Sequence, residues 1–230
     1  MAYLFAAIGD AFRLIATFDR AVVEASGASM TFALVSTAFA SILGIPVGVI
    51  LATSRIPFQR LMVASLNALL AIPTVVVGLF AYAMLNRQGP VGSLGLLFTP
   101  WAIIVGQTIL IVPLVTALVR SAVASVDEAY VATARTLGAG RLLTMYAIIR
   151  EARAGILVAC VTAFGRVIGE VGVSMMLGGN IAGFTRTITT VIALETAKGE
   201  FALALALGII LLAIAFVINI VLQLGRTAHQ

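Results

Sequence analysis

The sequence predicts an all-α polytopic membrane protein, and three observations support that fold class. Hydrophobic residues make up 62% of the 230 residues and charged residues only 10%, whereas a water-soluble chain of this length needs a charged shell around its cores. The mean hydropathy of +1.17 is far above that of a soluble domain. The apolar residues also form runs of roughly 20 to 25, the length that crosses a hydrocarbon layer as a helix.

Five such runs predict five transmembrane helices. They are Ser29–Ala52, Leu61–Leu85, Pro100–Val119, Gly155–Leu177 and Phe201–Leu224. Pro46, Pro73 and Pro113 fall inside the first three runs. We expect kinks there rather than ends, because neighbouring helices in a bundle can satisfy the carbonyls that a proline frees.

The N-terminal segment, residues 1–27, has a different pattern. The large apolar residues Phe5, Ile8, Phe12 and Ile15 recur at helical spacing. The charged residues of the segment lie off that stripe. This pattern is typical of an amphipathic helix that lies in the membrane interface. A signal peptide is the rival interpretation, but the segment has no basic start and Asp10 interrupts its apolar part. We therefore predict an interfacial helix over 1–27 and a transmembrane domain over 28–230.

The arginines indicate how the helices are oriented. They concentrate in residues 54–60, in residues 120–154 and near the C-terminus. Because cytoplasmic loops of membrane proteins are enriched in Lys and Arg, these parts are predicted to be cytoplasmic. The N-terminus and the loops 86–99 and 178–200 are then outside. The arginines are dispersed among apolar runs, so the net charge of +5 does not indicate nucleic-acid binding.

Several classes of chemistry lack their residues. One cysteine, Cys160, and one histidine, His229, exclude a disulfide framework, a Cys/His zinc centre and a Ser-His-Asp triad within the chain. The single lysine, Lys198, precedes a glycine and follows no glycine-rich run, so no Walker A phosphate loop is present. The sequence predicts neither an ATP-hydrolysing enzyme nor a cofactor.

The segment from Ser125 to Gly155 is too patterned to be a simple connection. Its apolar residues recur at helical spacing on either side of Gly138 and Gly140. This predicts two short amphipathic helices joined at a turn that glycine permits. Apolar positions exposed on the cytoplasmic side favour a partner protein. A hairpin folded back on the membrane is the alternative.

Two charged residues fall inside the fourth predicted span. Arg166 and Glu170 are four residues apart, so they share a helical face and can pair. A charge at mid-bilayer costs about 2.5–3.5 kcal/mol, so both should face the bundle or a water cavity. The pair, together with Ser174, either lines a translocation path or gate, or simply locks helix packing. Asn67, Gln107 and Thr108 could line the same path, but we expect most of these polar residues to bond between helices instead.

Two blocks of sequence resemble one family. The run ATARTLG, with Ala132, Ala134 and Gly138, resembles the EAA loop of ABC-importer permeases, and ARTLGAGR is similar to the loops of their oxyanion-transporting members. Residues 165–190, GRVIGEVGVSMMLGGNIAGFTRTITT, resemble molybdate- and tungstate-type permeases. Ala132 stands where that family usually has Glu. Arg150-Glu151 stands where it usually has Leu-Pro, which predicts a continuous helix into the fourth span; this departure resembles the tungstate branch.

The resemblance implies the transmembrane permease subunit of a type I ABC importer for an oxyanion, with tungstate favoured over molybdate or sulfate. It implies that residues of a coupling loop, about 121–154, contact a separate ATPase subunit: Ala132, Ala134, Arg135, Leu137, Gly138 and Arg141. It further implies a homodimer in a bacterial or archaeal inner membrane and an extracytoplasmic oxyanion-binding protein. From the residues alone, a passive anion channel and an integral-membrane enzyme remain as alternatives.

Overall fold

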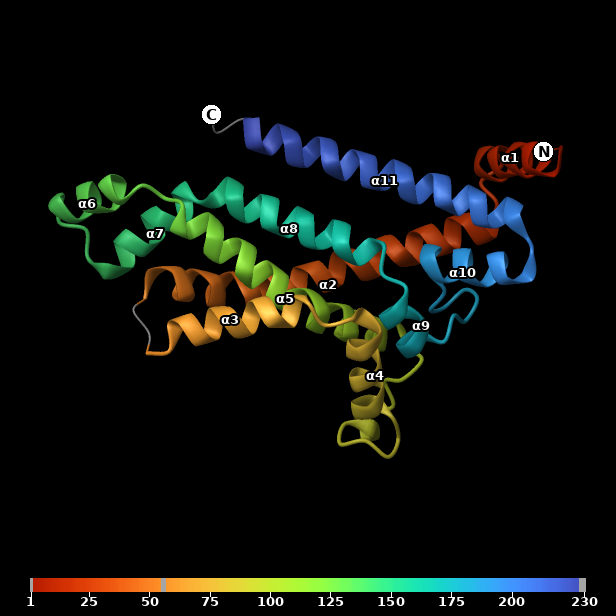
Figure 1. Cartoon of the computed structure of the whole chain (residues 1–230), viewed down its shortest axis with the longest axis horizontal. Helices are drawn as coiled ribbons and strands as arrows, with labels where there is room; N and C mark the ends of the chain where they lie inside the picture. Colours follow the sequence, from red (N-terminus) through yellow and green to blue (C-terminus); the bar gives the residue numbers. More distant parts are fainter. Residues whose placement is uncertain (1, 55–56, 228–230) are drawn as a thin grey trace.

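The computed structural model describes residues 2–54 and 57–227, and their regular structure is helical. Four long helices run along the main axis of the molecule: α2 (Arg20–Thr53), α5 (Pro100–Ala124), α8 (Arg153–Ile168) and α11 (Phe201–Thr227). Figure 1 shows the hairpin α6 (Glu128–Thr136) and α7 (Arg141–Glu151) at one end of this axis, hereafter the hairpin end. The opposite end carries α1 (Ala2–Ala16) and α10 (Ile188–Lys198).

The remaining helices are short. They are α3 (Gln59–Leu70), α4 (Thr74–Leu85), the 3₁₀ turn η1 (Gly92–Leu94) and α9 (Gly172–Gly178). In Figure 1, α3 lies along the bundle, whereas α4 points away from the long axis.

The membrane spans differ from the predicted ones in two places. Within the described residues, α2, α5 and α11 are each long and apolar enough to cross a membrane. The second and fourth predicted spans are broken instead: α3 and α4 meet at 97°, and α8 and α9 meet at 61°. The prediction of five spans holds when each bent pair counts as one span.

The prolines explain only one of these breaks. Pro46 and Pro113 lie inside the unbroken helices α2 and α5, as expected. Pro73, by contrast, lies at the break in the second span, where it is the residue directly before α4. A proline removes one backbone donor and clashes with the preceding turn, and neighbouring packing decides whether the helix continues.

The junction between α7 and α8 is a second correction. A continuous helix was predicted there, but α7 ends at Glu151 and α8 begins at Arg153. Ala152, between them, still accepts a hydrogen bond from the Ile156 N–H at 2.9 Å. The break is therefore one residue long.

A helix forms in the N-terminal segment, but it ends at Ala16 and α2 already begins at Arg20; its place in the membrane interface stays a prediction. Ala7 and Ala11 are buried, and Ala11, Leu14 and Ile15 join the apolar cluster that includes Leu207 of α11. Phe12 is exposed. Small alanines let α1 lie close to α11, which a stripe of large residues does not reveal. The domain boundary at residues 27 and 28 stays a prediction.

Helices α2 and α5 cross closely. Gly48 of α2 faces α5 so tightly that a Cβ atom there would lie 2.8 Å from the Thr116 carbonyl oxygen and 2.9 Å from Val119. The same crossing belongs to a large apolar cluster that includes Val115 of α5 and Ile156 of α8. This cluster holds the hairpin half of the bundle together.

Candidate functional site

The hairpin forms from the two amphipathic helices that the sequence predicts. α6 and α7 are joined by a turn in which Gly138 has a φ of +84°, a conformation that only glycine adopts without strain. Val131, Met145 and Ile148 face the main apolar cluster. Leu137 and Leu142 point away from it, with 82% and 79% of their surface exposed. The hairpin therefore presents an apolar surface that this chain does not cover.

The predicted coupling residues lie on this hairpin. Ala132, Leu137 and Gly138 are exposed and Ala134 is half-buried. Arg135 and Arg141 belong to α6 and α7, but their side chains lie outside the described residues. Tyr130, Leu143 and Tyr146 are also exposed, and the sequence prediction did not include them.

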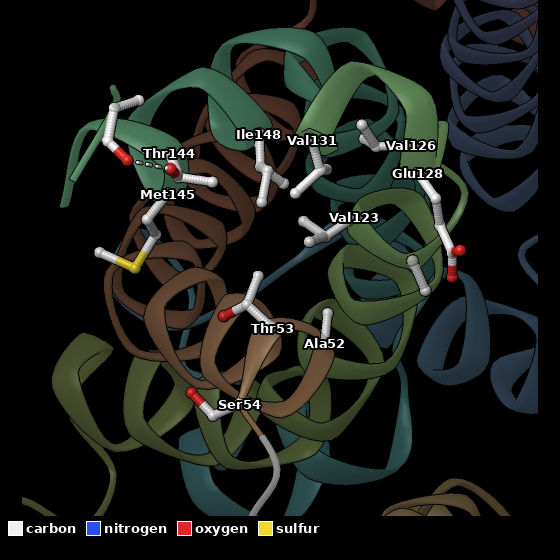
Figure 2. Close-up of a pocket in the computed structure, with 12 residues that line it drawn as sticks. Ala52, Thr53, Ser54, Val123, Val126, Glu128, Val131, Thr144, Met145 and Ile148 are labelled. Carbon is white, nitrogen blue, oxygen red and sulfur yellow. Dashed lines mark hydrogen bonds between the residues drawn. The ribbon is translucent and has the colours of Figure 1, made fainter. Parts of the chain in front are cut away.

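Cavities separate the hairpin from the bundle. One, of about 560 Å³, lies between the ends of α2 and α5 and the two hairpin helices. Figure 2 shows Val123, Val131 and Ile148 facing its interior, with Thr53 of α2 opposite. A second cavity of about 650 Å³ shares Val126 with the first. The hairpin therefore packs on the bundle through residues such as Ile148 and has open hollows beside these contacts.

The charged pair of the fourth span forms across the helix break. Arg166 lies in the last turn of α8, and its Nη1 donates to Glu170 Oε2 at 3.1 Å. Glu170 lies between α8 and α9 and is only 3% exposed, whereas 47% of the Arg166 side chain is exposed. The predicted pairing is confirmed, although Glu170 is not part of a continuous helix.

A chain of buried polar side chains connects three helices at the level of this break. The Ser36 hydroxyl of α2 donates to the side-chain Oε1 of Gln107 at 2.9 Å, and Gln107 Nε2 donates to the Ser174 hydroxyl of α9 at 3.3 Å. Gln107 thus bonds between helices as predicted, and Ser174 is fully buried. Thr108 donates to the Ile104 carbonyl within its own helix at 2.7 Å and also reaches the Ser36 carbonyl of α2 at 3.5 Å, so it too bonds between helices.

Sequence reasoning missed some members of this polar region. Ser29 accepts the Ile188 N–H at 2.7 Å, and Thr189 donates to the Glu170 carbonyl at 2.8 Å. Both connect α10 to the rest of the bundle. Ser and Thr are common in membrane helices, so only the fold distinguishes these two. Asn67, in contrast, is exposed on α3.

A charged pocket of about 440 Å³ lies at the end opposite the hairpin. It is lined by residues of the α1–α2 junction and of the loop before α10, among them Asp19, Arg20, Glu24 and Arg186. Arg20 and Glu24 form an ion pair of 2.6 Å there. The ion pair leaves this pocket with charged groups of both signs in its lining.

The comparison with known families decides the identity of the fold. Residues 44–224 match the model of the binding-protein-dependent transport system inner membrane component. The chain belongs to this family. It is therefore a multi-pass inner-membrane permease, which confirms the predicted family and a transport subunit rather than an enzyme.

Curated relatives cover nearly the whole permease. The tungstate uptake system permease protein of Peptoclostridium acidaminophilum is 38% identical over 96% of this chain and 97% of that protein. The tungstate uptake system permease protein of Campylobacter jejuni is 36% identical over 98% and 95%. The molybdenum transport system permease protein of Escherichia coli K12 is 30% identical over 71% and 78%.

Solved structures share the fold. The inward-facing MetNI methionine ABC transporter matches with a TM-score of 0.69 at 18% identity, covering 89% of this permease and 96% of that chain. A second match, an amino acid ABC transporter with histidines, has a TM-score of 0.68 at 16% identity. The predicted type I ABC importer permease fold is confirmed.

Proposed function

We propose that this permease is the transmembrane subunit of an ATP-driven importer that carries tungstate into the cell. The observation that supports the substrate is the similarity, along nearly the full length, to two tungstate uptake permeases. The similarity to a molybdenum permease is lower and covers less of the chain. Molybdate and sulfate are the alternative substrates of the same mechanism.

The exposed surface of the hairpin supports a separate ATPase subunit as its partner. Leu137 and Leu142 are the kind of uncovered apolar anchors that protein interfaces bury. With the hairpin in the cytoplasm, the C-terminus is cytoplasmic and the N-terminus outside. The charged pocket at the opposite end then faces outward, where an oxyanion-binding protein would dock.

A second copy of the permease completes the pathway. No described residue of α3 is buried, and its exposed residues include Leu61, Leu69 and the polar Asn67. Within a single chain, α3 is therefore a membrane segment with an uncovered polar residue. A homodimer would cover α3 and enclose the half-exposed Arg166, so that its charge faces a passing dianion.

Alternating access follows from these contacts. When ATP closes the ATPase subunits, they push the hairpin, and the hollows beneath it leave room for it to move. The movement reaches α8 through the single residue Ala152. Rigid-body rocking of the two permeases then opens the pathway on one side and closes it on the other.

The partner is tested by purification of the complex. Replacing Leu137 and Leu142 together by serine should reduce recovery of the ATPase subunit with the tagged permease by about tenfold, because two apolar anchors are lost. Leu94→Ser, at an exposed leucine of the η1 turn, is the matched control and should leave recovery unchanged. Equal recovery of the ATPase subunit with the wild type, the double variant and Leu94→Ser would contradict the proposal that the hairpin binds this subunit.

The substrate is tested in liposomes that contain the permease, its ATPase and its binding protein. Tungstate should stimulate ATP hydrolysis at lower concentrations than molybdate, and sulfate should stimulate it least. Equal stimulation by all three anions would overturn the tungstate assignment and leave the importer intact. No stimulation by any of them would overturn the oxyanion assignment.

A further inference from the structure

The two broken spans break at the same place in the fold. α3 gives way to α4 at residues 71–73, and α8 gives way to α9 at residues 169–171. Gly172, the first residue of α9, faces the first turn of α4. A Cβ atom at Gly172 would lie 3.1 Å from Val75 Cγ2 and 3.3 Å from Thr74 Oγ1. Two independent interruptions therefore meet in direct contact.

Beyond the breaks, α4 and α9 pack together along their length. A Cβ atom at Gly78 of α4 would lie 3.4 Å from the Val173 Cα and 3.1 Å from Met176 Sδ. Ala81 and Leu85 share one apolar cluster with Val173 and Leu177. This cluster is separate from the larger one that holds α8 and the hairpin. The two short helices form one packed unit.

Glu170 lies beside this contact, because a Cβ atom at Gly172 would also lie 3.3 Å from its Oε1, and it is bonded to three helices. Its Oε1 accepts a hydrogen bond from the Val173 N–H of α9 at 3.2 Å. Its Oε2 accepts one from Arg166 Nη1 of α8 at 3.1 Å. Its carbonyl oxygen accepts the Thr189 hydroxyl of α10 at 2.8 Å. The carboxylate thus caps the start of α9 while it pairs with the end of α8.

We infer that Glu170 is a positioning residue that makes the two breaks into one joint, about which α8 turns relative to the α4–α9 unit. The inference rests on the proposed transport function. α8 connects the hairpin at Ala152 to the joint at Gly169. Movement of the hairpin is therefore transmitted along α8 to the joint. There α4 and α9 move as one unit, because the packing between them does not change.

The first test crowds the joint without removing a charge. Gly172→Ala places a methyl group against Val75, Thr74 and Glu170, whereas a Cβ atom at Gly208 of α11, away from the joint, has no neighbour within 4 Å. In the reconstituted complex, Gly172→Ala should lower tungstate-stimulated ATP hydrolysis by about tenfold with basal hydrolysis retained. Gly208→Ala should behave as wild type. Equal stimulation in both variants would overturn the joint.

The second test separates the cap from the ion pair. In Glu170→Gln the side-chain oxygen still accepts the Val173 N–H, but the charge that pairs with Arg166 is lost; Glu170→Ala loses both. We expect Glu170→Gln to keep at least about half of the stimulated rate and Glu170→Ala to lose about tenfold. The tungstate concentration for half-maximal rate should stay unchanged in both. Loss of the stimulated rate in both variants alike would contradict a positioning role.

The third test fixes α4 to α9 covalently. Met176 Sδ lies 3.1 Å from the place of a Cβ atom at Gly78. The pair Gly78→Cys and Met176→Cys, made in a Cys160→Ser background to remove the native thiol, therefore puts two thiols within reach of a short bis-methanethiosulfonate cross-linker. If the helices move as one unit, cross-linking should leave at least about half of the uptake rate. Loss of uptake on cross-linking, restored by a reductant, would overturn the inference.

These outcomes separate the inference from the proposed function. If transport itself is assigned wrongly, the wild-type complex takes up no tungstate and no other oxyanion. If only the joint is assigned wrongly, the wild type transports and the matched variants fail to differ.

Discussion

The guanidinium of Arg166 is bonded on one side and open on the other. It pairs with the buried Glu170, yet about half of the side chain is uncovered. Lipid is a poor neighbour for this charge, at a cost of about 2.5–3.5 kcal/mol near mid-bilayer. The exposed side therefore belongs to a water-filled path or to the second permease, which is where we place the passing anion.

Replacing this charge tests that placement. Arg166→Met keeps the length of the side chain and removes its charge, so tungstate uptake should be abolished while the dimer still assembles. Arg166→Lys restores a positive charge and should recover part of the rate. The readouts are uptake into liposomes and size-exclusion chromatography. Normal uptake by Arg166→Met would leave the ion pair with a packing role alone.

Gly48 provides a residue-scale test of stability that is independent of transport. Gly48→Ala forces a methyl group against the Thr116 carbonyl and Val119. We therefore expect the free energy of unfolding to fall by about 1–3 kcal/mol. Gly27→Ala, in the same helix with no neighbour within 4 Å, should be neutral or slightly stabilising because alanine favours helix. Thermal unfolding in detergent measures both. Equal melting temperatures would contradict the close α2–α5 crossing.

At this scale the sequence predicts some contacts and hides others. The spacing of Arg166 and Glu170 was enough to predict their pairing, because residues four apart in a helix lie on one face. Ser29 and Thr189 could not be found, because their partners are 159 and 19 residues away in the chain. Only the fold brings such residues together.

Among the elements, the hairpin shows the strongest agreement between sequence and structure. Its two amphipathic patterns and its glycines are local signals, and local signals are what a sequence preserves best. The breaks at residues 71–73 and 169–171 are not local. Pro73 looks no different from Pro46 or Pro113 in the sequence, and only the packing of α4 against α9 makes it the site of a sharp bend.

The turn of the hairpin can be tested against a matched neighbour. Gly138→Ala places a side chain on a backbone with φ of +84° and should cost roughly 1–2 kcal/mol locally. Gly140 has a φ of −65°, so Gly140→Ala should be tolerated. We expect Gly138→Ala to weaken tungstate-stimulated ATP hydrolysis at unchanged expression. A larger defect in Gly140→Ala than in Gly138→Ala would contradict this account of the turn.

The molecule as a whole leaves several surfaces uncovered. The hairpin exposes leucines, α3 is uncovered and Arg166 is half-exposed. The sequence predicted a membrane bundle with a partner surface because composition and hydropathy act over the whole chain. It could not show how the surfaces are distributed, since that depends on which faces the helices bury against one another.

If ATP-driven movement of the hairpin powers transport, uptake must require ATP, and this requirement can be measured directly. The measurement is tungstate accumulation in liposomes that contain the permease, the ATPase and the binding protein, with and without ATP at the hairpin side. We expect tungstate to accumulate against its own concentration gradient. This accumulation should require ATP and should disappear when residues 131–146 are deleted. Uptake that proceeds to equilibrium without ATP, or that survives this deletion, would contradict it and point to a passive channel.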